Sequence, residues 1–319
     1  MTKKQAINLG FKAGVTLLLL GALYYQIGYN KRMGALWQAA SQSTAFPWLF
    51  AAALLMPLNW GFETLKWHGL IRRFSTLTFW QAYQSVMAGV AVSLFTPNRI
   101  GEYGGRVLLV EDGNGWRAVG ATLMGSISQM VALLSGGIIG LALFASSYFH
   151  WESYLLWSVT ATGAALATGV LLVYWYIDLL ALVAMKFKIS SRWKPLAEIL
   201  ALFQSYEKTE LKRALFYSWA RYLTYCFQYW LLLRFFGVEI GLTTALPGVA
   251  TIFFLQTSVP LPPAISLLAR GEIALLIWTA FGANEFSVLA ATFGLFILNL
   301  CLPALLGGWV IVKTNVLKS

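Results

Sequence analysis

The densest cluster of charged residues in the sequence lies inside an apolar stretch. Arg99, Glu102 and Arg106 fall within eight positions, and spacings of three and four residues put all three on one face of a helix. A helix beginning near Asn98 would add its positive N-terminal end to the two guanidinium groups. Together these groups could hold a phosphate or a carboxylate, with Glu102 bracing an arginine or carrying a coupling proton. The alternative is a structural ion network, or side chains that extend to lipid headgroups.

Three more charged residues occupy apolar surroundings further along the chain. Pro263 suits the first position of a helix, and Arg270 and Glu272 follow about two turns later. These two could form a second half of the binding site that matches the first cluster, or they could pair with each other. Arg221 lies about 15 Å along its helix from Leu211, so it needs a partner or water. Its candidate partners are Glu63, Glu102 and Glu272. The predicted substrate-binding residues are therefore Arg99, Glu102, Arg106, Arg221, Arg270 and Glu272.

The other reactive residue types argue against catalysis and against a metal site. The two aspartates, Asp112 and Asp178, are far apart in sequence, so no acidic cluster is available for magnesium. Cys226 and Cys301 lie within apolar runs and are expected to pack as small apolar groups. No hydrolase, zinc-protease or phosphate-loop motif is present. We expect no catalytic residues, no metal and no cofactor.

The elements that carry these residues must lie in a membrane. The 319-residue chain is 59% hydrophobic and only 11% charged, with a mean hydropathy of +0.68. A soluble domain carries about 25% charged residues, so most of this surface must face lipid. The net charge of +11 is then expected from basic cytoplasmic loops instead of nucleic-acid binding. The fold class predicted is an all-α integral membrane protein.

Two kinds of apolar stretch recur along the chain. Six are uninterrupted and predict full spans, at 11–29, 46–66, 117–147, 154–185, 211–236 and 286–311. Lys66 and Asp178 lie near span ends, where snorkelling is expected. The stretches 82–110 and 242–281 are instead broken by proline, at Pro97 and at Pro260 to Pro263. Irregular backbone survives in lipid only under cover of protein or a water-filled cavity, so each predicts a re-entrant hairpin.

The lysines and arginines favour this topology. With a retained first span and a cytoplasmic N-terminus, 18 of the 23 face the cytoplasm, three face outward, and Arg221 and Arg270 lie within the membrane. Full spans in place of hairpins would turn the basic 186–213 segment outward, against the positive-inside rule. The sequence therefore predicts two opposed repeats, 1–150 with hairpin 82–110 and 151–319 with hairpin 242–281. Both termini are expected in the cytoplasm, at the inner or plasma membrane.

The first hairpin resembles the lysylphosphatidylglycerol synthase transmembrane-region family, the flippase-like half of the multiple peptide resistance factor. The family's Thr-Pro-x-Arg-x-Gly-Glu-like signature matches Thr96, Pro97, Arg99, Gly101 and Glu102, with Arg106 following. At 261–272 the family's Arg-Gly-Glu ending is present, whereas its usual intervening glycines are replaced. The resemblance covers the whole chain in span pattern and implies a stand-alone member without a synthase domain.

The resemblance implies movement of lipids, such as aminoacylated phosphatidylglycerol or lipid-linked intermediates, between leaflets. The expected function is translocation of an anionic or zwitterionic lipid, whose partners are membrane lipids with phosphate-bearing headgroups. A secondary transporter of a small soluble anion is the first alternative. A membrane-embedded lipid-modifying enzyme and an assembly protein are the others. No enzyme activity and no nucleic-acid partner are expected, and the sequence predicts no oligomeric state.

Overall fold

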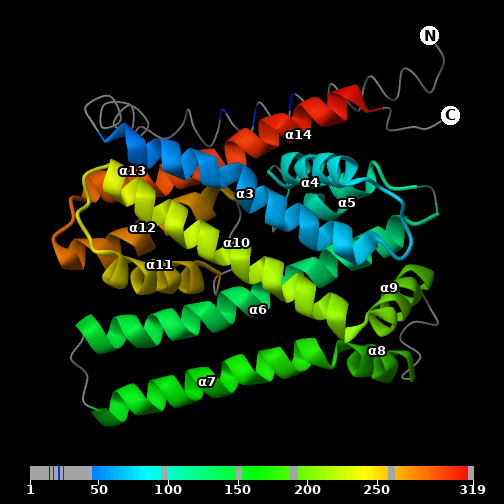
Figure 1. The fold of residues 1–319 in the computed structure, drawn as a ribbon, viewed down its shortest axis with the longest axis horizontal. Helices are drawn as coiled ribbons and strands as arrows, with labels where there is room; N and C mark the ends of the chain where they lie inside the picture. Colours follow the sequence, from blue (N-terminus) through cyan, green and yellow to red (C-terminus); the bar gives the residue numbers. More distant parts are fainter. Residues whose placement is uncertain are drawn as a thin grey trace.

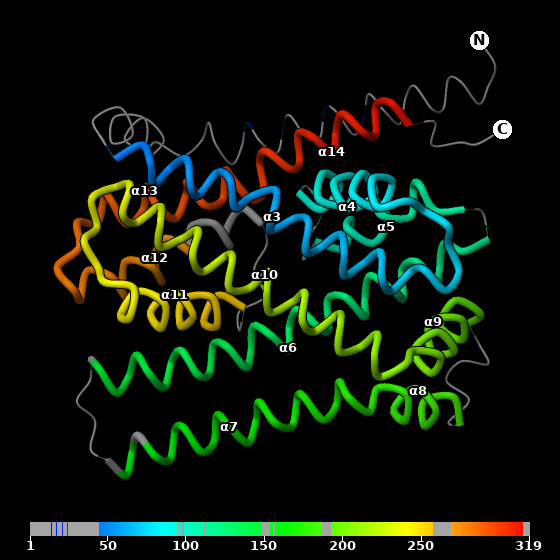
Figure 2. The backbone as a smooth tube through the Cα atoms, viewed as in Figure 1, coloured from blue at the N-terminus to red at the C-terminus, as the bar shows by residue number. Residues whose placement is uncertain are grey.

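The computed structural model describes residues 45–94, 96, 99–111, 113–148, 153–186, 193–257 and 263–314, with 14, 17, 21 and 24 as single positions. Every regular element in these ranges is helical (Figures 1 and 2). The predicted first span, 11–29, lies largely outside the described residues. The α-helices are α3 (Phe46–Ile71), α4 (Phe79–Ser93), α5 (Gly101–Val107), α6 (Gly115–Tyr148), α7 (Ser153–Trp175), α8 (Ile177–Lys186), α9 (Lys194–Ser205), α10 (Lys208–Phe235), α11 (Leu242–Thr257), α12 (Pro263–Trp278), α13 (Glu285–Phe296) and α14 (Leu302–Lys313).

Three of the described helical segments are long and apolar enough to cross a membrane: Gly115–Ser147, Trp157–Trp175 and Glu285–Lys313. The last comprises α13 and α14, joined by a π-helical turn at Ile297–Cys301. Only 11% of the Trp157–Trp175 segment is buried, so its leucines, valines and aromatic residues need a lipid environment. These segments match the predicted spans 117–147, 154–185 and 286–311, although the second ends ten residues early, at the break between α7 and α8.

The predicted spans 46–66 and 211–236 correspond to α3 and α10, which pack along each other (Figure 1). Both are long, but they carry charged and amide side chains that the lipid-facing α7 lacks. These polar groups meet where the two helices touch: Gln228 Nε2 donates to the carbonyl of Ala52 at 2.9 Å, and Arg221 Nε donates to Asn59 Oδ1 at 3.1 Å. The helix pair can therefore present apolar side chains outward and keep its polar side chains at the interface between the two helices.

Both proline-broken stretches fold as two helices that pack against each other. In the first, α4 ends at Ser93 and α5 begins at Gly101. In the second, α11 ends at Thr257 and α12 begins at Pro263, the position predicted for a helix start. A Cβ on Gly105 would lie 2.6 Å from the Cα of Gly89, so α4 and α5 are in backbone contact.

The first helix pair begins and ends at the same end of the molecule. Thr76, before α4, donates its hydroxyl to Glu111 at 2.7 Å, and Asn114, after α5, donates to the carbonyl of Phe74 at 2.9 Å. The same end holds the start of α10, because Arg73 Nε donates to Glu210 at 2.8 Å. That hydrogen bond raises the pKa of Arg73.

The second helix pair lies at the opposite end (Figure 1). Phe281, after α12, packs on Phe144 near the end of α6, with ring centroids 5.6 Å apart. The start of α3 is also here, since Phe46 contacts Phe235 at the end of α10. Gly248, early in α11, leaves room for the ring of Trp278 at the end of α12. The two helix pairs therefore enter the molecule from opposite ends.

The backbone contact between α4 and α5 predicts different effects of alanine on stability at two adjacent glycines. Gly105→Ala should lower the melting temperature, because its Cβ meets backbone atoms of Ala88 and Gly89 and overpacking costs about 1–3 kcal/mol. Gly104→Ala meets nothing within 4 Å and should be neutral or stabilising by about 0.5–1 kcal/mol. Thermal unfolding of the detergent-solubilised protein measures both, and equal effects would contradict this packing.

Candidate functional site

A buried carboxylate, Glu63 on α3, is the centre of the charged network. Its Oε1 accepts from Arg106 Nη2 of α5 at 2.8 Å, and its Oε2 accepts from Arg221 Nη1 of α10 at 2.6 Å. Lys66, one turn further on α3, places its Nζ 2.7 Å from the same Oε2. Glu63 is 4% exposed. One carboxylate therefore joins three cations from three helices.

Lys66 takes part in this network, contrary to the expectation that it snorkels. It is 2% exposed and reaches inward, where Nζ also donates to Gln129 Oε1 of α6 at 3.3 Å. The reason is that α3 continues to Ile71, beyond the predicted span end at residue 66. Lys66 thus lies more than a turn before the helix end, where Glu63 and Gln129 hold its ammonium group among the packed helices.

Glu102 and Arg106 lie on one face of α5, as their spacing predicts. They form an ion pair, and Arg106 is 1% exposed, with its guanidinium 5.7 Å from the ring centroid of Trp67. Arg106 reaches Glu63 because Gly89 of α4 leaves space for its side chain. A Cβ on Gly89 would lie 2.8 Å from Arg106 Cγ. The close packing of α4 on α5 thus places this arginine.

The backbone before α5 explains the Thr-Pro-x-Arg-x-Gly spacing. The Thr96 hydroxyl accepts from the backbone N–H of Gly101 at 2.8 Å, and a Cβ on Gly101 would lie 2.5 Å from the carbonyl oxygen of Val92. Arg99 has a φ of 59°, a left-handed conformation that is uncommon for a residue other than glycine. The helix therefore begins at Gly101 and not near Asn98. With seven residues it is too short to supply the N-terminal anion seat predicted there.

A cavity of about 690 Å³ lies between the two broken helix pairs, and both contribute residues to its walls. Three arginines line it: Arg99 from the first break, Arg221 from α10 and Arg270 from α12. The remaining walls combine hydroxyl and amide groups with apolar side chains. Arg221 lies 4.7 Å from the ring centroid of Trp60, which also lines the cavity. Arg99 extends toward Glu102 at 3.6 Å and is 47% exposed.

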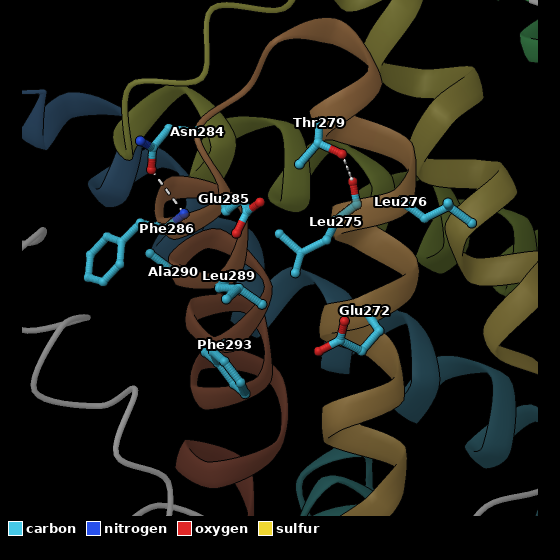
Figure 3. Close-up of a pocket in the computed structure, with 10 residues that line it drawn as sticks. All are labelled: Glu272, Leu275, Leu276, Thr279, Asn284, Glu285, Phe286, Leu289, Ala290 and Phe293. Atoms are coloured by element: carbon cyan, nitrogen blue, oxygen red, sulfur yellow. Dashed lines mark hydrogen bonds between the residues drawn. The ribbon is translucent and has the colours of Figure 1, made fainter.

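Glu272 does not line this cavity. It faces a second pocket of about 830 Å³ between α12 and α13, which Asn284 and Glu285 line from the start of α13 (Figure 3). Although only two positions separate Glu272 from Arg270, their side chains line different pockets. The structure thus brings together five of the six predicted site residues, through the network or the cavity, and separates Glu272 from them.

Several site residues were not predicted as binding residues. The sequence predicts Glu63 only as a candidate partner of Arg221 and assigns no role to Gln129, Asn299 or Trp60. Asn59 Nδ2 donates to Asn299 Oδ1 at 2.7 Å, which links α3 to the π-helical turn at 297–301. A usable signal was present in the sequence: Asn59 and Glu63 are four residues apart in an apolar helix and so share one face.

Glu63→Gln tests the central position of this carboxylate. Removing one partner of a buried ion pair costs about 3–5 kcal/mol, and here Lys66, Arg106 and Arg221 would all lose the negative charge that they share, while one acceptor oxygen would be replaced by a donating amide. We expect a strong fall in melting temperature, or loss of folded protein on size-exclusion chromatography. Glu239→Gln, at an exposed position, should leave both unchanged. A Glu63 variant as stable as the wild type would contradict the central role of this residue.

Comparison with known proteins gives one result. The family model described as the lysylphosphatidylglycerol synthase TM region matches residues 10–307. No curated protein and no solved structure matches the chain. The matched range includes both broken helix pairs, the charged network and the arginine-lined cavity. The chain is a multi-pass membrane protein that belongs to the lysylphosphatidylglycerol synthase transmembrane-region family.

Proposed function

We propose that this protein is a flippase-like lipid translocase that moves a phospholipid or lipid-linked intermediate with an anionic or zwitterionic headgroup between leaflets. The observation that carries the proposal is the cavity in which Arg99, Arg221 and Arg270 converge at the junction of two broken helix pairs. Charged residues inside a membrane protein typically mark a substrate or ion pathway. The family relation to membrane lipids supports the same reading.

The cavity walls suit a headgroup whose acyl chains remain in the bilayer. Arginine forks recognise phosphate oxygens, and the side chains of Gln129, Tyr225 and Gln256 add hydrogen-bonding groups. Met130 and Leu133 supply apolar surface to the same cavity. Arginine stays charged at neutral pH, so these groups are suited to holding an anion and not to acid–base catalysis. We therefore propose transport without chemical conversion.

The arrangement of the helix pairs supports an inverted-repeat mechanism. We propose that α4–α5 and α11–α12 are re-entrant hairpins that enter from opposite membrane faces and meet at mid-depth. The end with Arg72, Arg73 and the start of α10 would face the cytoplasm, following the positive-inside rule. Both termini would then be cytoplasmic, in the inner or plasma membrane. A headgroup in the cavity would then lie between the two hairpins, which have opposite orientations in the membrane.

Cysteine accessibility tests this topology. Arg72→Cys and Arg117→Cys, both exposed, should be labelled from the same side of the membrane by an impermeant maleimide, because α4–α5 returns to the end where it starts. Glu239→Cys, also exposed, should be labelled from the other side. The native cysteines, Cys226 and Cys301, are buried and should give little background. Labelling of positions 72 and 117 from opposite sides would exclude a re-entrant first hairpin.

Transport in proteoliposomes tests the function directly. The probes are acyl-labelled fluorescent phosphatidylglycerol and phosphatidic acid, with transfer followed by dithionite quenching. Arg270→Gln should slow transfer at least ~10-fold, since a hydrogen bond to a charged group contributes about 1.5–3 kcal/mol. Arg234→Gln removes an arginine at the outer end of α10, beside Trp48, and should transfer lipid at the wild-type rate.

Wild-type protein that transfers neither lipid faster than empty liposomes would contradict the proposal. Uptake of radiolabelled inorganic phosphate by the same vesicles would then favour a transporter of a small soluble anion.

A further inference from the structure

We infer that the group held in the arginine-lined cavity carries at least two negative charges, as a phosphomonoester or a diphosphate does. Phosphodiester and zwitterionic headgroups would then be poor ligands. The inference rests on the proposed function only for the lipid that carries this group. The charge of the group itself follows from the residues of the site.

The site contains more positive than negative charge. Five cationic side chains belong to the network and cavity: Lys66, Arg99, Arg106, Arg221 and Arg270. Among the described residues, the only carboxylates that contact these cations are Glu63 and Glu102. The excess is three positive charges. Arg99 is 47% exposed, but Lys66 and Arg106 are buried and Arg221 and Arg270 are half-buried. Uncompensated charge is costly to bury in a low-dielectric interior, so a ligand that supplies negative charge is favoured.

The two carboxylates are committed to the network behind the cavity. Glu63 uses Oε1 for Arg106 and Oε2 for Lys66 and Arg221. Glu102 uses Oε1 for Arg106, and its Oε2 lies 3.6 Å from Arg99 Nη2, a long distance for an ion pair. In the part of the chain that the structure describes, no carboxylate pairs with Arg270. Arg99 and Arg270 are therefore the cations most available to a ligand.

Trp60 contributes its ring to the cavity wall, where the guanidinium of Arg221 lies 4.7 Å from the ring centroid. The indole Nε1 itself is buried away from the cavity, so a ligand there does not reach this N–H. The ring therefore supports Arg221 in the cavity wall through a cation–π contact.

The charge of the headgroup then ranks the candidate lipids. A zwitterion leaves the excess of three unchanged, and a phosphodiester removes one charge. A phosphomonoester removes nearly two at neutral pH, and a diphosphate removes two or three. Headgroups that carry an added ammonium group would be repelled by Arg99 and Arg270. The site therefore favours a lipid with a terminal phosphate or a diphosphate linkage.

Binding to the purified full-length protein in a neutral detergent tests this ranking. The probes are dioctanoyl phosphatidic acid, phosphatidylglycerol and phosphatidylethanolamine, together with inorganic diphosphate, with affinity read from tryptophan fluorescence. At pH 7.5 phosphatidic acid should bind at least ~10-fold more tightly than phosphatidylglycerol. The preference should shrink at pH 5.5, because the phosphomonoester then binds one proton and carries a single negative charge, while the arginines remain charged.

Substitution at Arg270 provides the second part of this binding experiment. Arg270→Gln should weaken phosphatidic acid binding at least ~10-fold and phosphatidylglycerol binding less, whereas Arg234→Gln should change neither. The melting temperature without lipid shows whether each variant is folded. If Arg270→Gln does not fold, the pH dependence of the wild-type preference for phosphatidic acid still tests whether the site selects a dianion.

The outcomes separate this inference from the proposed function. Equal wild-type affinity for phosphatidic acid and phosphatidylglycerol would overturn the dianion inference and leave lipid translocation standing. Inorganic diphosphate that binds as tightly as phosphatidic acid would support the dianion site and overturn the lipid as its source. Preference for phosphatidic acid over both phosphatidylglycerol and inorganic diphosphate supports both.

Discussion

The compensation of buried charge at Glu63 is the constraint on which the rest of the structure depends. An unpaired carboxylate in a membrane interior is costly, and so is each of the three cations around it. Here α3, α5 and α10 each contribute one side of the arrangement, so none can move far without separating charges. The positions of Arg106 and Arg221 follow from this. So does the place of the cavity, because Arg221 serves both the network and the cavity wall.

Small residues make this network reachable. Arg106 extends past Gly89, and α5 rests on α4 through Gly105. On the other face of α4, Gly307 of α14 is packed against the backbone of Met87. Small residues at helix contacts allow close backbone approach, the usual means of helix association within membranes. In this protein the close contacts also fix where the charged side chains meet.

The interrupted backbone forms the site. At the first break, Thr96 satisfies the N–H of Gly101, and Arg99 takes the left-handed conformation. At the second, α12 begins at Pro263, whose missing N–H costs nothing at that position. A continuous helix would bury these segments in regular hydrogen bonding and leave no space between them. Described residues that flank the two breaks, such as Leu94 and Thr257, line one cavity, in which charged residues from distant parts of the chain can hold one ligand.

The sequence by itself determined the membrane class, the two proline breaks and one face of α5, because these depend on composition and on local periodicity. Apolar runs set the length of a helix, proline ends it, and a spacing of four residues aligns Glu102 with Arg106.

Long-range pairing was decided only by the tertiary structure. Glu63 and Arg221 are 158 positions apart, and no local pattern shows that they touch. Arg270 and Glu272 point to different sides because two positions along a helix turn a side chain by about 200°, but which pocket each one lines depends on the helices packed around α12. Burial of Lys66 likewise depended on how far α3 continued and on what packed around its end, which hydropathy alone does not specify.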